Sequence, residues 1–497
     1  MISMDSQYVI DGSYIQTLPK STGIGSETNP CMLVAGRYGT ADMIPVFGPN
    51  ATFEYILKSQ ATATRILSEN YPDIVPPKHA KALLETADLD RISPQRIREI
   101  EADTHHDVVA INTAWEEVVK EICPEATAHI NKGRTSADST ETAKALQFKE
   151  ATEIIIDSLE NLRDIVLEKA MSWKDIPHMD LTHRYDALPT TAGRPFVHYA
   201  EMLQSDIDKL YDAYNTSLFG KWGDATGNHH ALTGLDVDNP EEIQEMYCEL
   251  LGLKCMDAAA QTPGREYLFD FIAALGRTAE TMGNIATYIA TGRGDDTNTF
   301  VNVKPGKHVG SSTMPHKNAK NGNPSKEEQT VAYANMMGGF VATAQRSIQM
   351  AYARDLTNSA SDRIMHEIAF KWGDEVIRNL AKTVYYTELN IDRCVERVER
   401  SFGVVTSSPV MTDLTDCRKT ENPLSRAEAH DLAAELAQQA WDERRPFVDV
   451  LLENEEIIGR LDEEAIREIT NPLTYLGKSK EIIKTVYNKC HSNKKFE

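Results

Sequence analysis

The sequence predicts an all-α fold built around a bundle of long helices. Residues 134–176 contain no glycine or proline, and their apolar residues recur at helical spacing. A helix of that length would extend about 60 Å, which is long for a globular helix and typical of a helix bundle. Clear β-alternation is nearly absent from the chain. Further helical patterns cover residues 196–217, 241–251, 265–291, 326–350 and 361–389.

The length of 497 residues suggests about three domains. We expect the central long-helix bundle at residues 126–387, between smaller helical domains at 1–125 and 388–497, where shorter amphipathic segments carry their own turn signals. A polar stretch at 292–324 holds several glycines and prolines and is long for a structureless connection. It predicts a mobile binding loop or lid.

Composition excludes several classes of protein. The chain is 41% hydrophobic and 26% charged, which is typical of a globular protein and not of a disordered one. It has no apolar run long enough to cross a membrane and no signal-peptide pattern at its start, so we expect a cytoplasmic protein without membrane contact. A net charge of −23 disfavours nucleic acid as a partner. Seven scattered cysteines without a C-x-x-C pair indicate neither a disulfide framework nor a metal site.

The segment GSSTMPHK, residues 310–317, lies in the polar stretch and could carry chemistry. Its glycine frees the backbone beside paired hydroxyls, and the cation Lys317 lies six residues after Ser311. A serine acts as a base only where donors or positive charge stabilise its alkoxide, because its hydroxyl is a very weak acid. An ordinary serine-rich surface loop would show the same residues, so both interpretations stay open at this point.

This segment resembles the signature loop of the fumarase/aspartase superfamily, whose members eliminate fumarate from succinyl compounds. Other motifs between Arg37 and about residue 482 resemble, in matching order, the adenylosuccinate lyase family within it. The stretch LSRAEAHDLAAELAQQAW also resembles the closing domain of that family. The resemblance implies a homotetramer in which three subunits build each site. It implies no metal and no organic cofactor.

Several motifs of this resemblance imply contacts with an anionic substrate. RYGTADM and RDLTNSASDR resemble two phosphate-binding elements, and a helical RDLTNSASDR segment would bring its two arginines and one serine together. THHDVV resembles the family's T-[K/R]-H-D-V-V. TSADSTET resembles TS-x-D-x-x-x-T, whose hydroxyls bind a succinyl carboxylate, and it predicts a helix N-terminus. The implied substrate-binding residues are Arg37, Tyr38, Asp107, Thr135, Ser136, Gln261, Asn323, Arg354, Ser359 and Arg363.

The resemblance also implies the groups that move protons. Thr182-His183 followed by a PTT run resembles TH-x-Q-x-A-x-PTT, which implies that His183 is the general acid. Histidine suits this role because its pKa lies near working pH, although an isolated histidine is more often structural. Glu328 would orient this acid. The implied catalytic residues are Ser311, His183, His106, Lys317 and Glu328.

Two departures from the family pattern bear on the substrate. Four additional residues separate Lys317 from the Asn323-Pro324 pair, so that Asn321 could equally supply the asparagine. Tyr185 stands where the family has a substrate-binding glutamine.

The resemblance implies elimination of fumarate from succinylated purine nucleotides, namely from adenylosuccinate (giving AMP) and from SAICAR (giving AICAR). The alternatives are an enzyme of the argininosuccinate lyase or carboxymuconate cycloisomerase type, and a noncatalytic structural protein on the same fold. The two phosphate-binding motifs favour the nucleotide.

Overall fold

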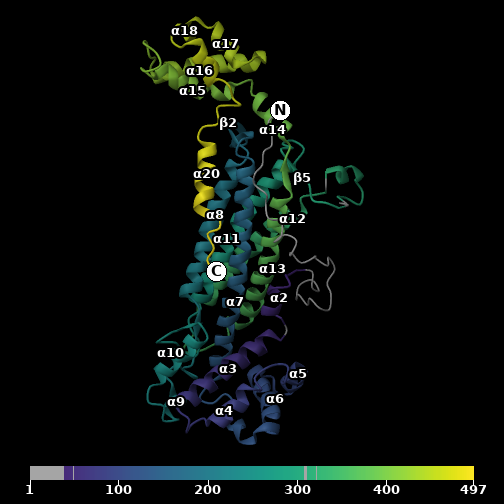
Figure 1. Cartoon of the computed structure of the whole chain (residues 1–497), viewed down its shortest axis with the longest axis vertical. Coiled ribbons are helices and arrows are strands. Elements are labelled where there is room, and N and C mark those ends of the chain that lie inside the picture. The colour runs from purple at the N-terminus through teal and green to yellow at the C-terminus, as the bar shows by residue number, and fades with distance from the viewer. Residues whose placement is uncertain (1–37, 49, 307–309, 321, 497) are drawn as a thin grey trace.

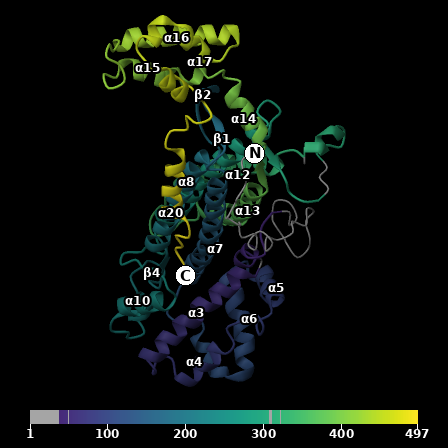
Figure 2. The same cartoon turned by 45° about the horizontal axis from the view of Figure 1, so that its top comes forward.

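The computed structural model describes residues 38–48, 50–306, 310–320 and 322–496 (Figure 1). Helices dominate the described residues and the strands are short, so the all-α prediction is confirmed. Five long helices pack side by side into an elongated bundle (Figures 1 and 2). They are α7 (Ser136–Ser172), α8 (Arg194–Thr216), α11 (Glu266–Arg293), α12 (Ser325–Ser347) and α13 (Ser359–Tyr385). Each lies within a few residues of a predicted helical segment.

Helix α7 is the longest of these five helices. Its 37 residues extend about 55 Å at 1.5 Å per residue. It packs against α8, α13 and α3, and its apolar stripe is buried, as at Leu159, Leu162 and Val166. The helix N-terminus predicted from the TSADSTET motif is confirmed, because Thr135 and Asp138 form a reciprocal capping box there.

A smaller cluster of helices lies at one end of the bundle (Figure 1). It has its own core around the fully buried Trp115, whose indole N–H donates to Thr86 Oγ1 at 2.9 Å. Short helices α9 (His230–Thr233) and α10 (Pro240–Leu250) lie near the same end. The elements before the bundle are α2 (Met43–Val46), α3 (Ala51–Asn70), α4 (Pro77–Leu84), α5 (Pro94–Thr104), α6 (Asp107–Ile122) and the 3-10 helix η1 (Pro124–His129).

A second cluster lies at the opposite end, around a core that includes Phe447, Val450 and Leu451. The last helix, α20 (Ser479–Cys490), returns along the bundle and packs on α7 and α8. The elements of this end are α14 (Ile391–Glu399), η3 (Val404–Thr406), α15 (Ser407–Thr415), α16 (Arg426–Glu443), α17 (Phe447–Glu453), α18 (Glu455–Ile458) and α19 (Glu463–Ile469).

Three two-stranded sheets join the helices. The hairpin of β1 (Pro177–Thr182) and β2 (Tyr185–Thr191) is antiparallel, as is the pair of β5 (Phe300–Asn302) and β6 (Thr387–Leu389). Strands β3 (Phe219–Gly220) and β4 (Lys254–Cys255) are parallel. The polar stretch 292–324 contains β5 and the 3-10 helix η2 (Pro315–Lys320). Among the described helices, none has the length and apolar character to cross a membrane.

Candidate active site

Residues from three helices meet near the N-terminus of α7. His106 caps α6, where its Nδ1 accepts the Val109 N–H at 3.5 Å, and its Nε2 lies 3.5 Å from Ser136 Oγ. The carboxylate of Asp107 lies 3.8 Å from the guanidinium of Arg363, in the second turn of α13. The starts of α6, α7 and α13 therefore lie close together. Helix N-termini and an arginine favour an anionic ligand at this place.

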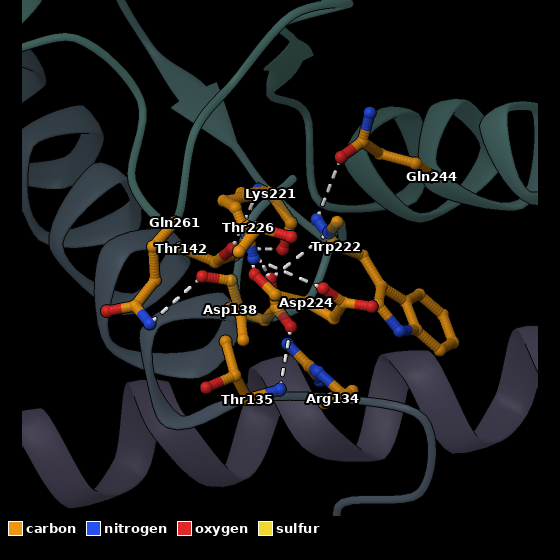
Figure 3. A network of polar contacts seen from close by, with 12 residues as sticks. Arg134, Thr135, Asp138, Thr142, Lys221, Trp222, Asp224, Thr226, Gln244 and Gln261 are labelled. Carbon is orange, nitrogen blue, oxygen red and sulfur yellow. Dashed lines mark hydrogen bonds and ion pairs between the residues drawn. The ribbon is translucent and has the colours of Figure 1, made fainter. Parts of the chain in front are cut away.

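A buried ion pair holds the start of α7 in position (Figure 3). Asp138 accepts the Thr135 N–H at 2.8 Å and the Gly223 N–H at 3.1 Å, and it pairs with the ammonium of Lys221. Neither side chain of that pair has exposed surface. Burial lowers the pKa of Lys221, and the Asp138 carboxylate opposes the shift. The segment GKWGDATGN is thereby fixed against α7.

A second buried network joins three bundle helices beside the first. The guanidinium of Arg265 donates to both carboxylate oxygens of Glu141, at 2.6 and 3.0 Å, and its Nε lies 3.3 Å from Asp362. Burial alone would raise the pKa of Glu141, but the charges of Lys144 and Arg265 hold it well below its ordinary value. Sequence reasoning missed this network, because each residue lies on a different helix without a local motif.

Gln261 and Arg354 lie together beside these networks. The backbone N–H of Gln261 donates to the Ala353 carbonyl at 3.2 Å, and its side-chain amide donates to the Ala225 carbonyl at 3.1 Å. The Nη1 atom of Arg354 is buried and has no hydrogen-bond partner among the described residues. A buried guanidinium nitrogen without an acceptor is well suited to an incoming anion.

The RDLTNSASDR segment is helical only in its second half. Helix α13 begins at Ser359, and Arg354 precedes it in an irregular segment. The Asp355 carboxylate accepts the Thr357 N–H at 3.0 Å and its hydroxyl at 2.5 Å, which favours a turn over a helix. The helical spacing argument therefore applies to Ser359 and Arg363, and not to Arg354.

In the signature loop, two backbone donors point at Ser311. Its Oγ accepts the Met314 N–H at 2.9 Å and the Thr313 N–H at 3.2 Å. At the base of the loop, the Asn323 amide donates to the Gly310 carbonyl at 2.7 Å. Lys317 is half-buried. Hydrogen bonds of this kind stabilise an alkoxide more than a hydroxyl.

His183 lies at the tip of the β1–β2 hairpin. His183 and Arg184 form its two-residue turn, and both have left-handed backbone conformations, with φ of 51° and 72°. Asn-Gly is the usual choice there, because other residues are strained in that region. Asp186, next along β2, pairs with Arg397 at 3.0 Å and Arg400 at 3.1 Å on and after α14. An exposed histidine kept in a strained turn is typical of a functional residue.

One chain does not bring all the predicted residues together. The hairpin with His183 lies at the end of the bundle beside α14, whereas α6 and His106 lie toward the other end (Figures 1 and 2). Glu328 is exposed in the first turn of α12. The Tyr38 ring lies 5.3 Å from that of Trp372, and Arg37 is outside the described residues.

Comparisons with known proteins agree with this architecture. The sequence profile described as "Lyase" matches residues 42–338, so the chain belongs to this lyase family of the fumarase/aspartase superfamily. It is a carbon–nitrogen lyase. The profile described as "Adenylosuccinate lyase C-terminus" matches residues 403–486. The family predicted from the motifs is confirmed.

The curated relatives support the family, and the solved structures support its fold. Adenylosuccinate lyase of Methanocaldococcus jannaschii is 29% identical over 461 residues, which cover 93% of this chain and 96% of the relative. Adenylosuccinate lyase of Bacillus subtilis is 28% identical, over 87% of this chain and 94% of its own length. Among solved structures, β-carboxy-cis,cis-muconate cycloisomerase from Acinetobacter calcoaceticus has a TM-score of 0.78 at 18% identity, covering 91% of this chain and 98% of the neighbour. That likeness supports the fold.

Proposed function

We propose that this chain releases fumarate from adenylosuccinate to give AMP, and from SAICAR to give AICAR. The observation that carries this proposal is similarity to adenylosuccinate lyases along about nine-tenths of the chain, including the separate match at residues 403–486. The meeting of three helix N-termini with Arg363 supports a small anionic substrate.

In the proposed mechanism, Ser311 is the base. Its alkoxide takes a proton from the carbon next to a succinyl carboxylate, and the electron pair moves into that carboxylate as an aci-carboxylate. The N–H groups of Thr313 and Met314, with Lys317, stabilise the alkoxide before transfer. His183, oriented by Glu328, protonates the departing nitrogen as the carbon–nitrogen bond breaks. Fumarate then leaves.

The remaining residues bind the two ends of the substrate. Ser136 and Thr135 bind a succinyl carboxylate at the start of α7, where His106 also lies. The nucleotide phosphate occupies the place marked by the unpaired Nη1 of Arg354 and by Arg363. The other proposed contacts are Arg37, Tyr38, Asp107, Gln261, Asn323 and Ser359.

We propose that a cytoplasmic homotetramer completes the site. The β1–β2 hairpin, which carries His183, lies at the opposite end of the bundle from α6, which His106 caps (Figures 1 and 2), so the proposed site takes these two residues from different subunits. Exposed apolar side chains also need a partner, since Leu356 is 68% exposed and Ile364 is 50% exposed near the start of α13. On α12, Met336 is 39% exposed. The long helices would then pack against those of other chains.

A matched pair of loop variants tests the assignment of the base. Ser311→Ala should lower fumarate release from adenylosuccinate by about a thousandfold or more, because no other group takes the proton. Ser312→Ala is the control, since among the described residues its Oγ contacts only the Thr313 hydroxyl, at 3.5 Å. Near-normal turnover by Ser311→Ala would overturn the assignment.

Mixing inactive variants tests whether subunits share the site. Ser311→Ala and His183→Ala chains, unfolded and refolded together, should recover activity, because some mixed sites contain neither substitution. Each variant refolded alone is the control. Mixed tetramers that stay inactive would contradict a site built from several chains.

A further inference from the structure

Potential metal ligands meet among the N-terminal helices. His79 on α4, Cys123 at the end of α6 and Glu125 in η1 each place one ligand atom within 4.8 Å of the others. The thiol of Cys123 lies 3.8 Å from Glu125 Oε2. This is the one such group in the part of the chain that the structure describes.

We propose that His79, Cys123 and Glu125 bind one divalent transition-metal ion of the zinc class. Thiolate, imidazole and carboxylate are the three ligand types that zinc takes in proteins. Tetrahedral bonds of about 2.0–2.3 Å would place the ligand atoms roughly 3.3–3.6 Å apart, so movements of about 1 Å would close the group. Calcium and magnesium select oxygen ligands and do not fit a thiol with an imidazole.

His129 positions the His79 ring in this group. Its Nε2 lies 3.0 Å from His79 Nδ1, and the two ring centroids are 5.1 Å apart. His129 is only 9% exposed, and its Nδ1 is buried and has no hydrogen-bond partner in the part of the chain that the structure describes. Metal-bound imidazoles commonly have such a partner on their second nitrogen, which fixes the direction of the ring.

Solvent reaches this group from the Glu125 side. Glu125 is exposed, His79 is partly exposed, and Cys123 is buried at 5% exposure. On binding, the Cys123 thiol releases one proton to solvent and its thiolate binds the ion, without any electron transfer. Water fills the remaining coordination position. The ion would join α4 to the segment that follows α6 and so clamp the N-terminal cluster of helices.

Cobalt(II) is the probe that tests this site. Full-length protein, first treated with a chelator, should bind one equivalent with a near-ultraviolet thiolate-to-cobalt band and visible bands of a four-coordinate site. Zinc should abolish both sets of bands. Cys123→Ser should remove the thiolate band, whereas Cys394→Ser, a buried cysteine outside this group, should keep it.

A second variant keeps the test decisive where Cys123→Ser folds poorly. Glu125 is exposed, so Glu125→Gln should fold normally. It should bind cobalt at least about tenfold more weakly, because the loss of a residue that supports a metal site generally weakens metal binding by that much. Each of three results would overturn the proposal. They are the absence of a thiolate band in the wild-type protein, the same band in folded Cys123→Ser, and an unchanged affinity for cobalt in Glu125→Gln.

Discussion

Replacing Lys221 by methionine would leave a buried carboxylate without its cation. Methionine keeps most of the volume and the apolar stem, so packing around the side chain changes little. Asp138, with no exposed surface, would keep the N–H groups of Thr135 and Gly223 but lose the ammonium. The Asp224 carbonyl, now 2.7 Å from that ammonium, would also lose its donor. Breaking a buried pair in this way costs about 3–5 kcal/mol.

Urea denaturation at neutral pH, followed by circular dichroism, would measure this loss in the free energy of unfolding. Lys209→Met is the matched control, because the Lys209–Asp212 pair is exposed and worth less than about 1 kcal/mol. Adding Asp138→Asn to Lys221→Met should recover part of the loss, since it removes the unpaired charge. A Lys221→Met protein no less stable than the Lys209→Met control would refute the reasoning.

Other changes test the β1–β2 hairpin, the buried His178 and the close packing at the start of α8. The double substitution His183→Asn with Arg184→Gly should raise the free energy of unfolding by about 1–2 kcal/mol, because it relieves the strain of the left-handed backbone. The same variant should lose fumarate release, and a lower free energy of unfolding would contradict this reasoning. Burial lowers the pKa of His178 to about 4. The free energy of unfolding should therefore fall by about 1.4 kcal/mol per pH unit as pH drops from about 6.5 toward 4, because the unfolded chain binds the proton first. If the free energy of unfolding of His178→Asn changed with pH in the same way, this reasoning would be refuted. Gly193→Ala should lower the free energy of unfolding by about 1–3 kcal/mol, because the added Cβ would overlap the Ala170 carbonyl. Gly283→Ala should not, because its Cβ would lie 3.7 Å from Ala334. Equal urea midpoints for the two variants would contradict this difference.

The bundle could be predicted from the sequence because its signal is local. The unbroken apolar periodicity of residues 134–176 led directly to α7, and the TSADSTET motif marked its start. The β1–β2 hairpin was missed, because its strands are short and a His-Arg turn is not a usual hairpin signal.

Features that depend on distant contacts could not be predicted. Arg354 would approach Ser359 and Arg363 only if the whole motif were helical, but the Asp355 side chain forms a turn before α13. The Arg265–Glu141 pair joins residues on separate helices, so neither has a recognisable neighbour in the sequence. The group at His79 and Cys123 was missed for the same reason. The expectation of no metal site rested on the local spacing of the cysteines and on the family resemblance, and neither depends on contacts between distant residues.

Incubating the purified protein with adenylosuccinate tests the proposed function most directly. We predict that the succinyl-purine absorbance falls while AMP and fumarate form in equal amounts, and that argininosuccinate releases no fumarate. The proposed substrate would be contradicted if adenylosuccinate stayed intact while argininosuccinate or another succinyl compound released fumarate. That result would assign the chain to another activity of the same lyase family.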